Sequence, residues 1–272
     1  VLGHVRENEG EVNWQSVEII KRELPISKFV SATVILGEAR YQKSAEEIEF
    51  IRKGAGVAEA TIQAILDNAR PGTLERRVFA HMKFANADAG GSFDPMFGWI
   101  SGPLGHTYHR VEQPSFRALQ PGDVVSIEIE GRWGGYIAQL DETFSVGPAH
   151  QDLKDGLKLA WESFDRTFAA CKPGATIGDL IEAGQVKGMN GRGEANLTMH
   201  GRGLGDDGPL VTTRITPAMR ALEVKEGCSF ILKPSARVDG KPDYGHWGES
   251  VVVRANGCER LGTRPQRVHE LI

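Results

Sequence analysis

The chain has 272 residues, of which 40% are hydrophobic and 25% charged, and its formal net charge is −4; these are ordinary values for a soluble globular protein. The lack of a basic excess argues against a nucleic-acid partner, and the lack of any run of 18 apolar residues argues against a membrane span. The three cysteines, Cys171, Cys228 and Cys258, lie far apart, which argues against a zinc site or a disulfide framework, and no secretory signal peptide opens the chain, so we expect a reducing cytoplasm.

The first 43 residues repeat nothing that follows. Apolar residues over 11–24 recur at helical spacing, whereas 27–36 is typical of a strand or a linker. The chain opens with Val1 rather than Met, so we expect a further segment to precede it.

A helix is predicted over 44–70. Ser44 is followed three residues later by Glu47, the pattern of a capping box. Apolar residues then recur at helical spacing until Pro71-Gly72 ends the helix.

A second helix is predicted over 151–171, and it also ends before a Pro-Gly pair. Thr176 and Asp179 follow as a possible second capping box. The two helices thus end in a similar way, with a Pro-Gly pair before the next helix. This similarity favours an internal duplication into two α+β halves. The alternative is two unrelated helix–turn–helix joints, because Pro-Gly turns are common.

Strand-like sequence lies between and after these helices. Residues 122–147 predict two strands around a Gly-rich turn, and 227–238 and 248–261 predict strand pairs of the same kind. Helices beside mostly antiparallel strands indicate an α+β layer fold.

Polar residues interrupt these strands. Glu128 and Glu130 alternate with isoleucines and share one face, and Gln139 and Asp141 share a face across the turn. His200, Lys233 and Glu249 lie beside other apolar runs. Such groups are exposed, paired or functional, and a solvated sheet face is the plainer alternative for the two glutamates.

Five segments in order resemble the creatinase, prolidase and aminopeptidase P family. They are the predicted helix start, the central hairpin "GDVVSIEIEG…GGYIAQLDETFSVG", "MHGRGLGDDGPLV", "GCSFILKP" and "GESVVVRANGCERL", within 43–263. The resemblance implies the pita-bread fold: two pseudo-symmetric halves around a curved, mainly antiparallel sheet. It also implies a catalytic-type domain over 43–272, preceded by the tail of an N-terminal domain and its linker over 1–42.

The resemblance further implies where metal ligands would lie. Peptidase members bind two metal ions through Asp, Asp, His, Glu and Glu. A neutral amide and an ammonium at two of these positions disfavour a metal, because such sites need negatively charged ligands. We therefore expect no metal and no other cofactor, with Lys233 lying between Glu128 and Glu249 and replacing the metal's charge. The five ligand positions fall on Glu128, Gln139, His200, Lys233 and Glu249.

Creatinase is a member that works without metal, and it suggests further residues. Its two substrate-binding glutamates fall on Asp141 and Glu249, and Glu128 and Gln139 are expected beside the substrate. Its catalytic histidine falls within "GHTYHRVEQPSFRALQPGD", where His109 and His106 are both candidates. We favour His109, because Arg110 after it is similar to the family's His-x-Arg pattern, whose strict histidine position would fall on Tyr108. His106 is then expected to bind substrate.

These expectations give a hydrolase, or a lyase, that acts on a small nitrogen-containing or carboxylate substrate without metal. His109, His200 and Lys233 are its expected catalytic residues. The alternatives are a metal-dependent peptidase of the Xaa-Pro type and a non-catalytic binding module. We expect a homodimer, the commonest oligomer, with neither a membrane nor a nucleic acid as partner.

Overall fold

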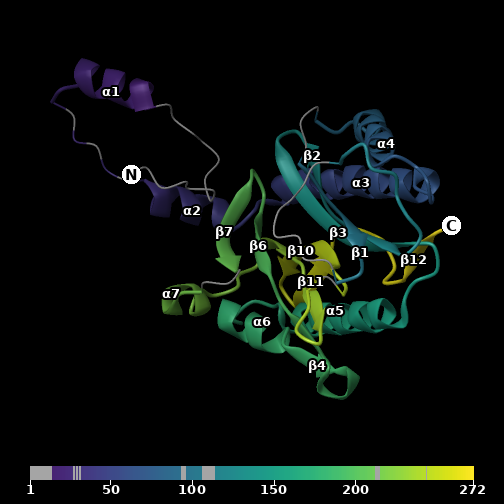
Figure 1. Ribbon diagram of the computed structural model, residues 1–272. Helices are drawn as coiled ribbons and strands as arrows, with labels where there is room; N and C mark the ends of the chain where they lie inside the picture. The colour runs from purple at the N-terminus through teal and green to yellow at the C-terminus, as the bar shows by residue number, and fades with distance from the viewer. Residues whose placement is uncertain are drawn as a thin grey trace.

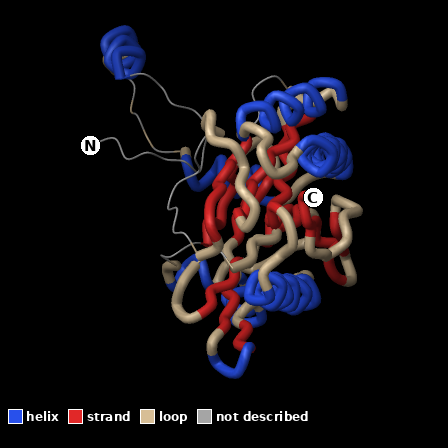
Figure 2. The backbone as a smooth tube through the Cα atoms, turned by 45° about the vertical axis from the view of Figure 1, so that its right-hand side comes forward, coloured by secondary structure: helices blue, strands red, loops and turns tan. Residues whose placement is uncertain are grey.

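The computed structural model begins its described part with two short helices, α1 (Trp14–Glu23) and α2 (Thr33–Tyr41). No side chain of α1 is buried, and Figures 1 and 2 both show this helix apart from the sheet. The prediction of a strand or linker over 27–36 is wrong from residue 33 onward, because α2 begins at Thr33. The described residues are 14–26, 28, 30, 32–92, 96–105, 114–211, 215–242 and 244–272.

A nine-stranded sheet forms the centre of the molecule. Its strands are β1 (Phe97–Pro103), β2 (Asp123–Trp133), β3 (Tyr136–Val146), β6 (Met199–Arg202), β7 (Asp206–Val211), β8 (Ser229–Leu232), β10 (Gly248–Arg254), β11 (Gly257–Arg260) and β12 (His269–Leu271). The order is β1-β2-β3-β10-β8-β6-β7, with β11 beside β10 and β12 beside β3. All pairs are antiparallel except β12 with β3. The predicted hairpin over 122–147 is therefore confirmed as β2 and β3.

Two helices, α3 (Ala45–Asn68) and α4 (Glu75–Asp88), cover one half of the sheet. The predicted capping box is present, with the side chains of Ser44 and Glu47 each accepting the other residue's backbone N–H. Apolar side chains of α3 pack against β2 and β3 in one core cluster. The capping pair and the apolar stripe thus fix where this helix begins and which face it buries.

The second half repeats the order of a long helix and a shorter one, α5 (Gln151–Ala170) and α6 (Ile177–Ala183). The expected capping box of Thr176 and Asp179 begins α6. The segment 227–238 is not a strand pair, because its two strands join different sheets across Lys233-Pro234. The smaller elements are β4 (Val186–Gly188), η1 (Met189–Gly191), β5 (Gly193–Asn196), α7 (Pro217–Arg220) and β9 (Ser235–Val238), of which β4, β5 and β9 form a separate sheet.

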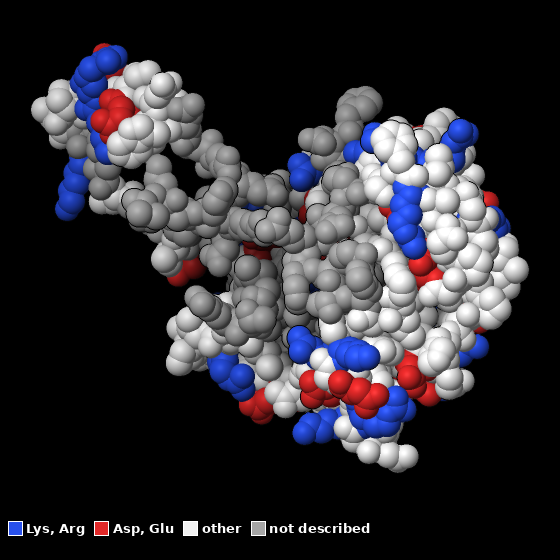
Figure 3. Space-filling view, viewed as in Figure 1, with Lys and Arg blue, Asp and Glu red and all other residues white. Residues whose placement is uncertain are grey.

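The architecture is the α+β arrangement predicted from the strand and helix patterns. Figure 1 shows α3 and α4 above the curved sheet and α5 and α6 below it, so that each pair covers one half. On the face drawn in Figure 3, acidic and basic side chains of the described residues are interspersed. Among the described helices, none combines the length and apolar character needed to cross a bilayer.

Candidate active site

Neighbouring strands of the central sheet direct polar residues to one face. Glu128 of β2 lies opposite Asp141 of β3, and Asp141 lies opposite Gly248 of β10. Directly paired residues of antiparallel strands point to the same side, so these three positions share a face, which we call the inner face. The outer face carries the alternate residues, such as Ile127 and Leu140, and packs against α3.

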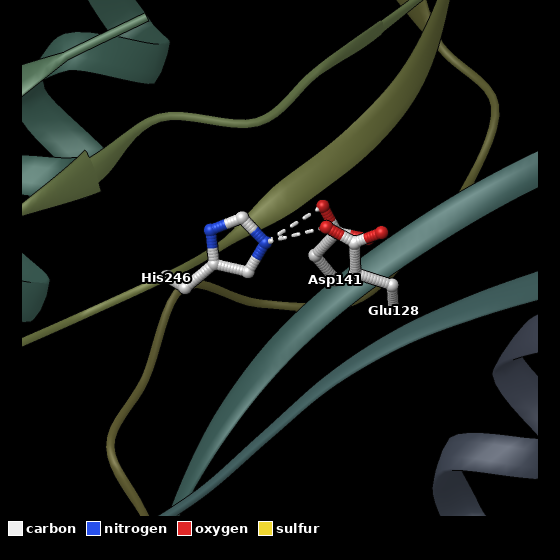
Figure 4. Close-up of side chains that lie close together, drawn as sticks. All are labelled: Glu128, Asp141 and His246. Carbon is white, nitrogen blue, oxygen red and sulfur yellow. Dashed lines mark ion pairs between the residues drawn. The ribbon is translucent and has the colours of Figure 1, made fainter. Parts of the chain in front are cut away.

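Two cationic side chains from the second half reach the inner-face carboxylates. Lys233 follows β8, and its Nζ lies 3.3 Å from Glu128 Oε1. His246 lies two residues before β10, and its Nε2 is 3.0 Å from Asp141 Oδ2 and 3.7 Å from Glu128 Oε1 (Figure 4). Gln139 donates from Nε2 to Asp141 Oδ1 over 2.8 Å. The structure thus brings Glu128, Gln139, Asp141 and Lys233 together and adds His246.

The backbone of His246 is fixed to β3 by one hydroxyl. Thr143 Oγ1 donates to the carbonyl oxygen of His246 over 2.7 Å and accepts its N–H over 3.0 Å. Thr143 lies two residues after Asp141 on the same strand and therefore shares the inner face. β3, the strand that carries Asp141, therefore sets the position and the direction of the imidazole.

The charges of this cluster balance one another. Burial lowers the pKa of His246, but Asp141 and Glu128 outweigh it and raise this pKa to about 10. Burial also raises the pKa of Glu128, yet His246 and Lys233 together hold this pKa well below its usual range. At neutral pH the cluster therefore holds two carboxylates and two cations.

His200 of β6 faces the same region as a neutral imidazole. Its side chain is buried, and its Nδ1 lies 3.1 Å from the carbonyl oxygen of Gly201. Burial, with help from Arg202 and Lys233, lowers the pKa of His200 well below its ordinary value. Because a carbonyl oxygen only accepts, Nδ1 carries the proton and Nε2 holds a free lone pair.

A second charged group borders the site. Arg202 is buried and donates to Glu130 Oε1 over 2.9 Å and to Asp206 Oδ1 over 2.8 Å. Burial raises the pKa of Glu130 against the opposing effect of Arg202. Glu130 is thus held in an ion-paired wall of the inner face and does not face bulk solvent.

The expectation that Glu249 lies in this cluster is wrong. Glu249 is paired with Leu140 and Leu232 and therefore points to the outer face. Its Oε2 lies 3.0 Å from Arg260 Nη2 and 3.8 Å from Arg264 Nη2. Among the described residues, Lys233 consequently pairs with Glu128, and the residue of β10 opposite Asp141 on the inner face is Gly248.

Two predicted histidines remain to be placed, and one histidine of the cluster was not predicted. His106 and His109 lie outside the described residues. No sequence pattern pointed to His246, which stands outside the regular strands. The available signal was its spacing, since it lies two residues before Gly248 and alternation places both on one face.

The side chains present fit a divalent metal ion poorly. Glu128, Asp141 and His246 each offer one ligand atom, all within 4.8 Å of one another. The Lys233 ammonium already bonds to Glu128 there, and an ammonium about 4 Å from a divalent ion adds about 8 kcal/mol of repulsion at an effective dielectric near 20. His246 would also have to lose a proton whose pKa is about 10. The donor set is therefore not that of a two-metal centre.

Comparison with protein families and curated proteins gives a consistent result. The model of metallopeptidase family M24 matches residues 49–255. The chain is 25% identical to the Xaa-Pro dipeptidase of Pyrococcus furiosus, over 95% of this chain and 73% of that protein. It is 29% identical to an uncharacterized hydrolase/peptidase of Sinorhizobium fredii, over 95% of this chain and 66% of that protein. The chain thus spans about two thirds to three quarters of the length of these relatives.

Solved structures share the fold. The prolidase from Pyrococcus horikoshii superposes with a TM-score of 0.78 at 20% identity, over 97% of this chain and 74% of that one. Dipeptidase PepE from Mycobacterium ulcerans gives a TM-score of 0.76 at 22% identity, over 96% and 69% of the two chains. The predicted pita-bread fold is confirmed by this likeness.

Proposed function

Because the chain belongs to metallopeptidase family M24, we propose that it hydrolyses a C–N bond in a small nitrogen-containing or carboxylate substrate, and that it does so without a metal ion. One observation carries the proposal: Lys233 and His246 supply two cations at the carboxylates Glu128 and Asp141. The protein itself thereby provides the positive charge for which this family ordinarily uses metal.

The base of the proposed reaction is His200. Its Nε2 lone pair has no partner among the described residues, and its lowered pKa keeps the imidazole neutral at pH 7. A neutral imidazole can take a proton from water as the water attacks a carbonyl or amidine carbon. The same base would also support an elimination.

The oxyanion stabiliser of the proposed reaction is Lys233. Glu128 is the partner of its ammonium among the described residues, which leaves N–H donors for a developing negative charge. Gln139, which donates to Asp141 on the same face, has a buried Oε1 without a hydrogen-bond partner there. This amide oxygen can accept an N–H of a nitrogenous substrate.

The proposal is tested by turnover with and without metal. Purified protein would be treated with a chelator and assayed on guanidino acids and on Xaa-Pro dipeptides, beside elemental analysis. We expect turnover that is insensitive to chelator and to added Mn²⁺, Zn²⁺ or Co²⁺. Lys233→Met should lower kcat/KM about 100-fold or more, as for loss of one oxyanion donor, whereas the exposed-helix variant Lys21→Met should not.

A metal-dependent dipeptidase is the second candidate, and the names of the curated relatives favour it. The close grouping of Glu128, Asp141 and His246 is the place where a single cation would bind. Stoichiometric metal together with activation of Xaa-Pro cleavage would establish this candidate over the first. Absence of turnover on either substrate class would leave the third possibility, a binding module.

Three further expectations belong to this proposal. The substrate is a small molecule or dipeptide, in line with the names of the relatives. The active form is a homodimer, which sedimentation of the protein checks. The cytoplasm is its compartment, in line with three cysteines that all remain free thiols.

A further inference from the structure

We propose that the substrate carries an uncharged, mainly apolar tail, and that a pocket at the far end of the inner face binds this tail. The inference rests on the proposed C–N hydrolysis and names the class of substrate: the small nitrogenous group is one end of an amide with a long aliphatic acyl chain. The pocket has a volume of about 380 Å³. We call it the tail pocket, and its lining includes Leu104, Val124, Ser145, His150, Leu153 and Tyr244.

Two strands connect the tail pocket with the charged cluster. Val124 of β2 and Ser145 of β3 line the pocket and lie opposite one another, as Glu128 and Asp141 do in the cluster. Residues four apart on a strand share a face and lie about 13 Å from one another. The pocket therefore lies on the same face as the cluster, at a distance that one extended molecule spans.

The inner face between the pocket and the cluster carries small side chains. Ser126 of β2 is half-buried there and lies opposite Ile100 of β1. The neighbouring positions of β1 on this face are Gly98 and Gly102, which have no side chain. Because β2 lies between β1 and β3, its backbone groups are used within the sheet. A peptide would find few partners here for its own amides, whereas an aliphatic chain needs none.

The walls of the tail pocket are apolar and uncharged. Leu104, Val124 and Leu153 come from the end of β1, from β2 and from α5, and they pack in one hydrophobic cluster. Among the residues that the structure describes, no Asp, Glu, Lys or Arg lines the pocket. Burial of a charge without a partner is costly, so the pocket favours an uncharged group of the substrate.

Three polar atoms at the pocket have no partner within the described part of the chain. The side chain of Ser145 is only 3% exposed, and its hydroxyl makes no hydrogen bond there. The same holds for the Tyr244 hydroxyl and for Nε2 of His150, whose Nδ1 accepts the Asp152 N–H over 3.2 Å. Buried polar groups ordinarily have a partner, so these atoms suit a tail with an apolar body and one uncharged polar atom, or water, at its end.

Dependence on chain length tests the tail pocket. The probes are the p-nitroanilides of acetic acid and decanoic acid, since an extended decanoyl chain reaches the pocket from the cluster and an acetyl group does not. Each buried methylene is worth about a factor of four, so we expect kcat/KM to be about 100-fold or more higher for the decanoyl probe. Ser145→Leu fills the pocket and should reduce this ratio to less than about 10. The matched substitution Ser16→Leu, on the exposed helix α1, should leave the ratio as in wild type.

A second variant, His150→Trp, fills the pocket from its exposed rim and replaces Ser145→Leu where that protein shows no thermal unfolding transition. No preference for the decanoyl probe in wild-type protein, or a preference that survives in the folded variants, would overturn the proposal. If wild-type protein cleaves neither anilide, the proposed function fails, and calorimetric titration with decanamide then tests the pocket by itself. We expect saturable binding that is about 10-fold or more weaker in the pocket-filling variant, and no binding of acetamide. Absence of saturable decanamide binding would refute the tail pocket.

Discussion

At the residue scale, the charge of His246 contributes to stability as well as to the proposed chemistry. Its pKa rises from 6.5 to about 10 in the folded protein. A group with a raised folded pKa stabilises fully below its unfolded pKa and loses this effect as the pH rises through the folded value. The contribution of His246 should therefore be complete below about pH 6.5 and disappear by about pH 10.

This pH dependence is measurable by urea denaturation of wild-type protein and His246→Gln between pH 6 and 10. We expect the difference in their free energies of unfolding to fall by roughly 2–4 kcal/mol over that range. The subtraction removes the groups that titrate alike in both proteins. A difference that stays constant or grows with pH would show that the imidazole is neutral in the folded state.

Residue patterns predicted much of the inner face, and one error shows where such prediction fails. Alternation correctly put Glu128 on the face of Glu130 and Gln139 on the face of Asp141, because the side-chain period of a strand is two. For β10 the resemblance pointed to Glu249, and a shift of one residue reverses the face. His246 was missed because its partners, Glu128 and Asp141, are more than 100 residues away in sequence and no local pattern records the contact.

At the element scale, the two halves of the sheet meet at a short seam between β3 and β10. Only Gly248 with Asp141 and Glu249 with Leu140 are paired across it in the described strands. Arg264 spans the seam, donating from Nη2 to the Gly248 carbonyl oxygen over 2.8 Å and from Nη1 to Glu142 Oε2 over 2.5 Å. The inner-face residues of the two halves are therefore held in register by a cation on the outer face.

Removing this cation should destabilise the protein in a pH-dependent way. Glu142 is fully buried, and burial raises its pKa to about 7 even with Arg264 present. Arg264→Met should cost about 3–5 kcal/mol at pH 8, where the buried carboxylate has lost this cation and must either stay charged or take up a proton. The loss should shrink at pH 5.5, where Glu142 can be protonated.

The double variant Glu142→Gln with Arg264→Met is the matched control for this prediction. It removes the unpaired charge and should recover part of the stability at pH 8. Urea denaturation of wild-type protein, Arg264→Met, Glu142→Gln and the double variant supplies the four free energies. Equal losses at both pH values, or no recovery in the double variant, would show that Arg264 acts by packing against Trp247 and not by its charge.

Elements with local signals were predictable, and those set by distant partners were not. The capping boxes predict where α3 and α6 begin, because the two residues of each box lie within four positions of one another. The strands around Lys233-Pro234 follow one another in sequence but join different sheets, and only the tertiary fold decides that. The start of α2 was missed because β-branched residues such as Val34 and Ile35 locally favour a strand.

At the scale of the whole molecule, the chain has the fold of the family, and its inner face holds a cation and an amide among the carboxylates. The chain superposes on two solved prolidases with TM-scores of 0.75 and 0.78, and its inner face carries Lys233, Gln139 and Gly248 beside the carboxylates Glu128 and Asp141. Fold is specified by many buried apolar residues, whereas the chemistry depends on a few polar ones. Similarity of the whole chain therefore supports the fold and the family more strongly than it supports one substrate.

We predict where the folded unit begins from the contacts of the first two helices. α1 has no buried side chain, but the end of α2 is tied to the second half. Tyr41 donates from its hydroxyl to the Glu223 carbonyl oxygen over 2.8 Å, and its ring lies 6.3 Å from that of Phe230. Arg40 also pairs with the buried Asp207.

Two truncations separate these contributions. Removal of residues 1–32 should leave the melting temperature within about 2 °C of wild type, because it takes away no buried side chain among the described residues. Removal of residues 1–42 also deletes Arg40 and Tyr41, leaves Asp207 with Lys43 as its remaining cation, and should cost about 2–3 kcal/mol, or roughly 5–10 °C. Calorimetry of the two truncated proteins measures both shifts. Equal melting temperatures would place the boundary of the folded unit after residue 42, and a large loss in the shorter truncation would place it before residue 33.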